Sequence, residues 1–267
     1  MQWQIIISIL IFALSSMTFA DQSNIRLLSK KDLPHQLGTF REIEFNLSDD
    51  QTITFDSALL NYRYQAELYQ NENKIQLLAD YLDELSQKNN FIIGINGGYY
   101  QANFTPAGLF MYQGKLIKPI SHSPFFNACL IINDKNNVLI GTNLEACKNA
   151  HNALQAGPLL IEDYKKSSRL PLLQKKSKSM ADFFDQHKRT VLAVTNDDRL
   201  LIIITSPIAL IDLADFLEKH ADAFGVKKIK IAMNLDGGSS TGMYIRFADE
   251  PFYSHELKHV KTFLFVK

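Results

Sequence analysis

The stretch Ile229-Lys-Ile-Ala-Met-Asn-Leu-Asp-Gly-Gly-Ser-Ser240 decides how the rest of the chain is organised. Its first five residues are mainly apolar and predict a buried strand. The two glycines that follow Asp236 allow a tight turn and a close approach of the backbone to a ligand, because they carry no Cβ atom. Asp-Gly-Gly is also an ordinary turn sequence. This stretch alone is therefore compatible either with a polar ligand-binding site or with a turn that has only a structural role.

A second stretch, Phe91-Ile-Ile-Gly-Ile-Asn-Gly-Gly-Tyr-Tyr100, follows the same plan of apolar strand, asparagine, two glycines and hydroxyl-bearing residues. The repetition suggests two neighbouring strands that end at the same rim of a sheet. On that hypothesis Asn96, Asn234 and Asp236 would come together in one site.

Shorter patterns predict the remaining elements. Helices are expected over residues 73–88 and from Ser206-Pro207 to Gly225, because apolar residues recur there at helical spacing. Residues 101–123 are expected to be irregular, since two X-Pro pairs interrupt them. Strands are expected at residues 39–45, 61–70, 128–133, 138–142, 191–195, 200–205 and 260–267, with hairpin turns at 134–137 and 196–198.

Composition is that of an ordinary globular protein. The 267 residues are 46% hydrophobic and carry 28 basic and 28 acidic side chains, so the net charge gives no argument for binding nucleic acid or an anionic membrane. We expect an α+β fold, with residues 40–267 forming a single domain after an extended lead-in at residues 21–39. In this domain a mixed β-sheet would carry helices and a cleft built from loops.

Residues 1–20 have the pattern of a signal peptide. An apolar run at Ile5–Leu14 precedes Thr18-Phe-Ala20, an acceptable cleavage site, and this predicts export to the periplasm or the medium. The first residues lack Lys and Arg, which leaves an uncleaved membrane anchor as the alternative. Only this segment would contact a membrane. Cys129 and Cys147 could form a disulfide in an exported protein, and two buried thiols are the other reading.

Five motifs in chain order resemble the phosphodiester glycosidase family, in which a lysosomal member removes N-acetylglucosamine from a phosphodiester. The motifs are Ile95-Asn-Gly-Gly-Tyr-Tyr100, Phe104-Thr-Pro-Ala-Gly-Leu109, Ala156-Gly-Pro-Leu-Leu160, Arg189-Thr190 and Asn234-Leu-Asp-Gly-Gly-Ser-Ser240. The resemblance spans residues 40–267 and implies hydrolysis of a sugar-1-phosphodiester to a free sugar and a phosphate monoester. One departure is Ser239, which stands where the family has a third glycine.

Cleavage at the anomeric carbon of such a diester needs few groups. The transition state resembles an oxocarbenium ion, so a nearby carboxylate stabilises it or attacks it. The leaving phosphate monoester has a second pKa of about 6 and departs as an anion without much help from an acid. A guanidinium that holds the phosphate bidentately would assist. Asp236 is the candidate carboxylate and Arg189 the candidate phosphate anchor, with a structural ion pair as the alternative role for Arg189.

The other candidate residues would bind the substrate. Asn96 and Asn234 would hydrogen-bond the sugar, while Tyr99 or Tyr100 would form an apolar wall or simply pack in the core. Thr190 and the backbone N–H groups after Asp236 would assist the arginine. The complete set of expected substrate-binding residues is Asn96, Gly97, Gly98, Tyr99, Gly157, Thr190, Asn234, Gly237, Gly238 and Ser239.

Two other kinds of site are compatible with parts of the sequence. His255-Glu-Leu-Lys-His259 matches the zinc-peptidase pattern, but a closing strand follows it directly and no third ligand lies downstream. Oxygen atoms around Asp236 could instead bind Ca²⁺, which would suit a non-catalytic, calcium-dependent glycan-binding module. We expect no cofactor for hydrolysis, with calcium as the open alternative. The expected partner is a glycosyl phosphodiester or a cell-envelope glycan.

A basic segment lies at residues 162–180, with six Lys and Arg side chains. Such a run is usually a solvated loop. Because it precedes Arg189, a basic flap beside an anionic substrate is the functional alternative.

Overall fold

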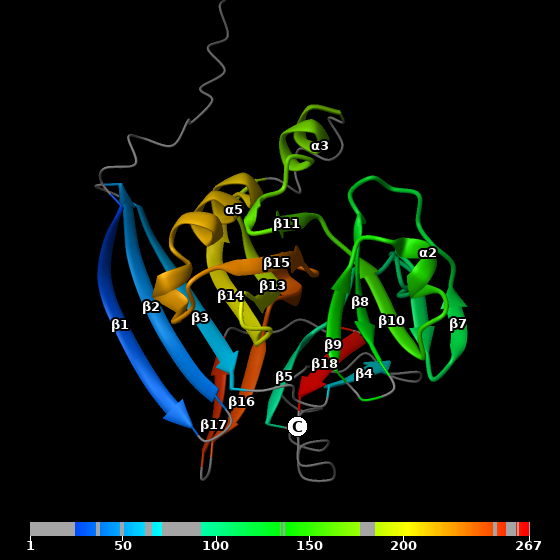
Figure 1. Ribbon diagram of the computed structural model, residues 1–267, viewed down its shortest axis with the longest axis horizontal. Coiled ribbons are helices and arrows are strands. Elements are labelled where there is room, and N and C mark those ends of the chain that lie inside the picture. Colours follow the sequence, from blue (N-terminus) through cyan, green and yellow to red (C-terminus); the bar gives the residue numbers. More distant parts are fainter. Residues whose placement is uncertain are drawn as a thin grey trace, which may run out of the picture.

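The computed structural model describes residues 25–35, 38–48, 51–61, 66–70, 92–133, 135, 137–176, 185–247, 250–254, 260 and 262–266, and its strands form three sheets (Figure 1). The first sheet contains, in spatial order, β1 (Arg26–His35), β2 (Gly38–Ser48), β3 (Gln51–Leu60), β14 (Leu200–Ile208), β13 (His187–Thr195), β15 (Ile229–Asn234), β11 (Leu159–Glu162) and β12 (Lys165–Lys166). We call it the large sheet.

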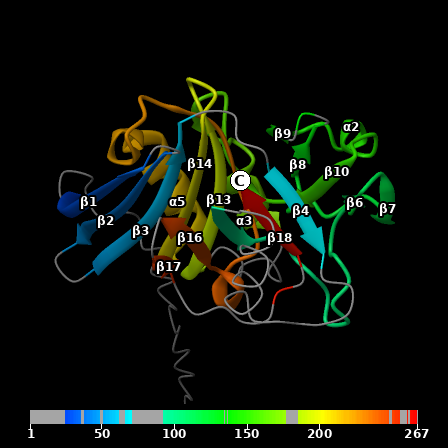
Figure 2. The same ribbon diagram turned by 90° about the horizontal axis from the view of Figure 1, so that it is seen from below.

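Two smaller sheets complete the architecture. The second consists of β7 (Lys115–Lys118), β6 (Phe110–Tyr112), β10 (Asn152–Ala156), β8 (Ala128–Ile132) and β9 (Val138–Gly141). The third consists of β17 (Glu250–Ser254), β16 (Met243–Phe247), β5 (Ile93–Asn96), β18 (Thr262–Val266) and β4 (Ala66–Gln70). In Figure 1 the third sheet lies below the other two, and the view from below shows β4 beside β18 (Figure 2).

The fold is richer in β-structure than the α+β class expected from the sequence. The expectation of a mixed sheet is wrong, because every strand pair in the described residues is antiparallel. Hairpins and short connections join many of these strands, and such connections produce antiparallel pairs. Residues 26–35, expected as part of an extended lead-in, pair along their whole length with β2.

The centre of the large sheet is buried on both faces. In β14, Leu201 and Ile203 pack into the core on one side, while Leu200, Ile202 and Ile204 pack into the core on the other. This explains why the strand reads as an uninterrupted apolar run and not as an alternating one. The second of these cores draws residues from all three sheets, so it holds them together.

The helix α5 (Leu210–Lys219) covers one face of the large sheet, and the 3₁₀ helix η2 (Ala221–Phe224) continues it. Phe216 stacks on Phe55 of β3 with 4.5 Å between ring centroids. Gly225 ends η2 in the left-handed conformation, with φ of 78°, as expected for a helix stop.

The start predicted for this helix is wrong. Ser206 and Pro207 belong to β14, where the pairing register shifts opposite the start of β13, and Ala209 is the N-cap of α5. The Ser206 hydroxyl accepts a hydrogen bond from the Thr54 N–H at 2.9 Å. A proline fits this position because a bulge has a backbone site that needs no N–H donor.

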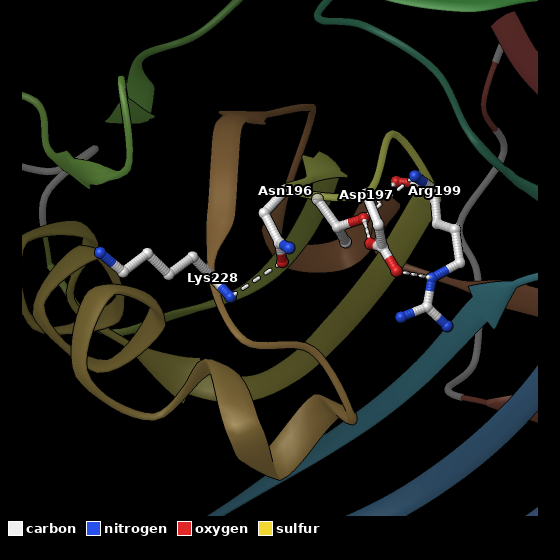
Figure 3. Close-up of polar contacts among 5 residues, drawn as sticks. Asn196, Asp197, Arg199 and Lys228 are labelled. Carbon is white, nitrogen blue, oxygen red and sulfur yellow. Dashed lines mark hydrogen bonds and ion pairs between the residues drawn. The ribbon is translucent and has the colours of Figure 1, made fainter.

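The turn between β13 and β14 agrees with the hairpin expected from the sequence (Figure 3). Asp198 has a positive φ of 57°, a conformation that Asp and Asn tolerate better than most residues. Arg199 Nε lies 2.7 Å from Asp197 Oδ2, and Asn196 Oδ1 accepts a hydrogen bond from the Lys228 N–H at 3.1 Å. The last bond ties the turn to the residues that lead into β15.

The second sheet contains regular structure where the sequence suggested none. Within residues 101–123, strands β6 and β7 form a hairpin around Gln113 and Gly114, both of which have positive φ. The prediction failed because the two prolines lie outside the hairpin: Pro106 precedes β6, and Pro119 directly follows Lys118, the last residue of β7. Cys129 of β8 and Cys147 of α2 (Leu144–Cys147) form a disulfide, which settles the choice left open by the sequence.

The basic segment is also ordered over residues 162–176. It forms β12 and the helix α3 (Leu170–Lys176), and Lys166 Nζ lies 2.6 Å from Asp215 Oδ2 of α5. Arg169 lies 3.4 Å from Glu162. Two of its cations therefore pair with acidic side chains, so this part is not a freely solvated loop.

Several expectations lie outside the described residues: the signal segment 1–20, the helix at 73–88 and the histidine motif at 255–259. Within the described residues, no helix is both long enough and apolar enough to cross a membrane.

Candidate functional site

One pocket gathers the principal candidate residues. It has a volume of about 380 Å³ and lies where the residues after β5 and β15 meet the first residues of β13. Its lining consists of Tyr99, His187, Arg189, Asp236, Gly237, Gly238 and Ser239. The sequence predicted six of these seven residues, and the exception is His187.

The turns Asn96-Gly-Gly98 and Asp236-Gly-Gly238 meet, but they do not follow neighbouring strands. β5 belongs to the third sheet, between β16 and β18, whereas β15 lies between β13 and β11 in the large sheet. Asn96 Nδ2 donates to the backbone carbonyl of Asp236 at 2.8 Å, and the Asp236 N–H donates to the Gly97 carbonyl at 3.2 Å. The predicted convergence is confirmed, and the predicted adjacency of the strands is wrong.

Asp236 follows β15 directly and forms part of the pocket wall. Its side chain remains partly exposed to the pocket, but protein atoms crowd around it, and this burial raises its pKa from 3.8 to about 6. Hydrogen bonds from the Ser240 side chain and the Gly237 N–H act in the opposite direction. The Gly237 N–H donates to Oδ1 at 2.8 Å. The carboxyl group is therefore largely ionised at neutral pH and available for nucleophilic or electrostatic work.

Gly237 allows the carboxylate turn to pack against β13. A Cβ atom at this position would lie 2.8 Å from the backbone oxygen of Lys188, too close for any side chain. Gly97 is restricted in the same way, because its Cβ would lie 2.4 Å from Thr262 Oγ1 and 2.8 Å from the Thr262 backbone oxygen. The glycines that the sequence marked as ligand-binding thus have a packing role at these two positions.

Arg189 is almost completely buried, with 3% of its surface exposed, yet it lines the pocket. Nε donates to the carbonyl of Ile208 at 3.0 Å, and Nη2 donates to the carbonyl of Asp185. Burial lowers the pKa of Arg189 to about 10, so the side chain is still charged at neutral pH. Within the described part of the chain it forms no ion pair, and Nη1 donates no hydrogen bond.

These contacts orient the guanidinium without neutralising it. The two backbone carbonyls fix the plane of the group and take up the edge formed by Nε and Nη2. Within the described ranges, the hydrogens of Nη1 and the second hydrogen of Nη2 have no acceptor, and they are suited to binding an anion. A structural ion pair, the alternative weighed for Arg189, has no partner among the described residues.

Tyr99 rather than Tyr100 lines the pocket. The Tyr99 hydroxyl donates to the Gly157 carbonyl at 3.1 Å and accepts from Asn234 Nδ2 at 2.5 Å. Burial, together with the charge of Asp236, raises the pKa of Tyr99 far above its ordinary value. The residue is therefore a neutral phenol whose ring is fixed at the pocket wall. Tyr100 stacks on Phe104 instead.

Asn96, Thr190 and Asn234 are fully buried behind the pocket lining. Asn96 Oδ1 accepts from Thr190 Oγ1 at 2.7 Å and from the Gly242 N–H at 3.2 Å. Asn234 Nδ2 donates to the Leu235 carbonyl at 2.7 Å as well as to Tyr99. In this structure the side chains expected to bind sugar or phosphate hold the site together.

His187 is the pocket residue that sequence reasoning missed. It opens β13, two positions before Arg189, and its side chain is exposed. The apolar pattern predicted a strand only from Val191, so the polar residues before it were not recognised as strand. Strand alternation extended back from Arg189 would have placed His187 on the same face.

The described ranges contain no group of three or more His, Cys, Asp or Glu side chains placed to hold a metal ion.

Comparison with known proteins identifies the family of the chain. A sequence model of the family described as phosphodiester glycosidase matches residues 89–267. A search of curated proteins gave no significant match.

Two solved structures show the same fold. The catalytic domain of zebrafish N-acetylglucosamine-1-phosphodiester alpha-N-acetylglucosaminidase, auto-inhibited by its pro-peptide, is similar with a TM-score of 0.60 and 14% identity, over 91% of this chain and 83% of that one. A hypothetical protein from Synechocystis has a TM-score of 0.60 and 12% identity, over 90% of this chain and 64% of that one. Since the family model covers more than half of the sequence, the chain belongs to the phosphodiester glycosidase family.

Proposed function

We propose that this protein is an exported glycoside hydrolase that cleaves a sugar-1-phosphodiester. The observation that carries the proposal is the presence of Asp236 and Arg189 in the lining of one pocket. In the reaction the bond between the anomeric carbon and the phosphate oxygen breaks, and its electron pair leaves with the phosphate. The oxygen of water becomes bonded to the anomeric carbon, and the proton of that water passes to solvent.

The role proposed for Asp236 follows from its charge. Positive charge develops on the anomeric carbon and the ring oxygen as the phosphate departs. A carboxylate with a pKa of about 6 is ionised at neutral pH, and its partial burial strengthens its interaction with that charge. It acts either as the nucleophile of a covalent intermediate or as an electrostatic stabiliser.

The role proposed for Arg189 is to hold the leaving phosphate. Its guanidinium is positively charged, and its two bonds to backbone carbonyls hold it in place before substrate arrives. The N–H groups of Gly238 and Ser239, which line the same pocket, would add neutral donors. Tyr99 would provide the wall against which the sugar ring packs.

Export is supported by the disulfide between Cys129 and Cys147, because such bonds persist mainly in oxidising compartments. N-terminal sequencing of protein recovered from the periplasm or medium should begin near Asp21. Full-length protein that begins at Met1 in the membrane fraction would show that the segment is an uncleaved anchor instead.

Hydrolysis in ¹⁸O-labelled water distinguishes the proposed reaction from cleavage at phosphorus. Attack at the anomeric carbon places the label in the free sugar, whereas a phosphodiesterase would place it in the phosphate monoester. Label found in the phosphate would contradict the proposal even if the products were otherwise the same.

Replacement of the arginine tests the phosphate anchor. Arg189→Lys keeps a positive charge but loses the planar group, so we expect kcat/KM for a sugar-1-phosphodiester to fall by about a hundredfold. A glycoside of the same sugar with a neutral aryl leaving group should be a poor substrate whose rate changes little. An equal loss on both substrates, together with a lower Tm, would show that Arg189 is mainly structural.

A further inference from the structure

A second pocket lies at the opposite end of β13 and β15 from Arg189 and Asp236. It has a volume of about 270 Å³ and is formed between these strands and β9, which lies on the side of the second sheet that faces the large sheet (Figure 2). We call it the β9 pocket. Its volume is below the roughly 300–1,000 Å³ that is typical of sites for small organic ligands, so it suits a few residues of a chain better than a whole cofactor.

One wall of the β9 pocket is apolar and belongs to the large sheet. Val194 of β13 is paired with Leu200 of β14 and with Ile231 of β15, so the three side chains lie side by side on one face. All three line the pocket. We call them the apolar row, and together they offer a surface on which a branched aliphatic side chain can pack.

The opposite wall is the outer edge of β9, which is an outermost strand of the second sheet. Three successive residues, Val138, Leu139 and Ile140, line the pocket. Successive side chains of a strand point to opposite faces of the sheet. A cavity can therefore touch all three residues only along the edge of the strand, where the backbone groups lie.

The pairing of β9 with β8 identifies the backbone groups that point to this edge. A bond of 3.1 Å from the Asn133 N–H to the Asn137 carbonyl closes the hairpin and fixes the alternation of the ladder. Leu139 is then bonded to β8, whereas the N–H and C=O groups of Val138 and Ile140 point away from β8. Within the described residues these four groups have no hydrogen-bond partner.

The rim of the β9 pocket carries charged side chains. Lys230 Nζ lies 3.2 Å from Asp198 Oδ1, and both residues are exposed, so this ion pair adds little to stability and Lys230 can pair with another carboxylate. Lys135, on the turn before β9, is exposed and forms no ion pair in the described part of the chain. Over these ranges the rim has more positive than negative charge, which favours an acidic partner.

We infer that the β9 pocket binds an extended, acidic peptide segment of another protein, which adds a strand to the outer edge of β9. The main chain of the peptide exchanges hydrogen bonds with Val138 and Ile140. One aliphatic side chain packs on the apolar row, and an acidic side chain on the same face of the peptide pairs with Lys230. This inference goes beyond the proposed function and does not depend on it.

The test is a titration of a fluorescent peptide with the full mature protein, followed by anisotropy. The probe is Ser-Glu-Thr-Ile-Thr-Glu-Ser with blocked ends, which presents isoleucine and both glutamates on one face and reads the same in either strand direction. We expect saturable binding that weakens by about tenfold or more when the isoleucine is replaced by alanine. Binding that does not saturate at millimolar protein would overturn the inference.

Methylation of the peptide backbone tests the added strand itself. Of two successive N–H groups in an extended peptide, one faces β9, so N-methylation of two central residues should weaken binding by about tenfold or more. An N-methylated peptide that binds as tightly as the parent would show that side chains alone make the contact, and the added strand would be wrong.

Charge reversal on the protein tests the location. Lys230→Glu should weaken binding by about fivefold or more. Lys228→Glu is the matched control, because Lys228 is exposed on the segment leading into β15 and does not line the pocket. Both variants should keep the Tm of wild type, since both side chains are exposed. Equal losses in the two variants would indicate unspecific attraction to a basic surface and would contradict the inference.

Amide hydrogen exchange measured by NMR locates the hydrogen bonds. At saturating peptide the N–H groups of Val138 and Ile140 should exchange at least about tenfold more slowly, whereas that of Leu139, already bonded to β8, should change little. Unchanged exchange at Val138 and Ile140 would overturn the inference. Protection of these amides without peptide, appearing only at high protein concentration, would assign the edge to a second copy of the chain instead.

Hydrolysis separates this inference from the proposed function. Turnover of a sugar-1-phosphodiester should be unchanged at saturating peptide, because the two pockets lie at opposite ends of β13 and β15. Competitive inhibition by the peptide would place it in the pocket of Asp236 and would contradict the inference. If the peptide binds at β9 but no sugar-1-phosphodiester is hydrolysed, the peptide site stands and the proposed function is wrong.

Discussion

The side-chain amide of Asn96 donates a hydrogen bond to the backbone carbonyl of Asp236 at 2.8 Å, and this bond joins two different sheets. Asn96 ends β5 of the third sheet, whereas Asp236 follows β15 of the large sheet. The amide oxygen of Asn96 is bonded in turn by Thr190 of β13 and by the Gly242 N–H. One buried side chain therefore sets the position of the carboxylate relative to the strand that carries Arg189.

Asn96→Ala should destabilise the protein strongly. The substitution leaves the Thr190 hydroxyl, the Gly242 N–H and the Asp236 carbonyl without their partner in a buried site, at a cost of about 1–3 kcal/mol for each unsatisfied group. We expect a fall in Tm of at least about 5 °C by differential scanning calorimetry. The exposed Asn103 provides the matched control, and Asn103→Ala should change Tm much less. A Tm for Asn96→Ala equal to that of the control would show that the hydrogen bonds of the Asn96 side chain contribute little to stability.

Asp236→Asn should increase the stability of the folded protein at neutral pH, although it should lower the activity. The pKa of Asp236 is about 6 in the folded protein against 3.8 for the unperturbed group, so the folded state holds its proton to higher pH than the unfolded state. Stability therefore falls as pH rises from about 4 to about 6. Above that range the ionised group costs up to about 3 kcal/mol. Asparagine removes this cost.

Chemical denaturation at two pH values checks the sign. At pH 8 the free energy of unfolding of Asp236→Asn should exceed that of wild type, and at pH 4 the two should be nearly equal. A variant that is less stable than wild type at pH 8 would mean that the Asp236 charge is favourably paired in the folded protein.

Activity should depend on pH through the same group. If the carboxylate form of Asp236 is the active form, kcat/KM for a phosphodiester substrate rises about tenfold per pH unit below pH 6 and levels off above it. Arg189, whose pKa is about 10, stays charged across this plateau. Initial rates from pH 4 to pH 9 test the profile. Rates that fall as pH rises through 6 would show that Asp236 works as an acid.

The sequence predicted the site better than it predicted the sheets. The turns at Asn96-Gly-Gly98 and Asp236-Gly-Gly238 could be found because an apolar strand that ends in polar residues and glycines is a local signal. Arg189 and Thr190 were identified through the resemblance to the family, since the polar start of β13 has no strand pattern of its own. His187 lay outside the matched motif and was missed for that reason.

Other features depend on contacts between distant segments, and no local pattern contains them. That β5 and β15 lie in different sheets follows from their pairing with β16, β18, β13 and β11. Asn96 and Asn234 looked like ligands because an asparagine at a strand end near two glycines carries an amide that can hydrogen-bond a sugar. Their burial and their hydrogen bonds to Thr190, Tyr99 and the Asp236 carbonyl became visible only when the sheets were assembled.

The most direct test of the account is the turnover of a sugar-1-phosphodiester by wild-type protein and by Asp236→Asn. Wild type should release free sugar and a phosphate monoester. Asp236→Asn should lower kcat by about a thousandfold or more, a change of roughly 4 kcal/mol in the barrier, while the variant stays folded and still binds phosphate. Near-normal turnover by the folded variant would contradict the central claim that the carboxylate of Asp236 drives cleavage at the anomeric carbon.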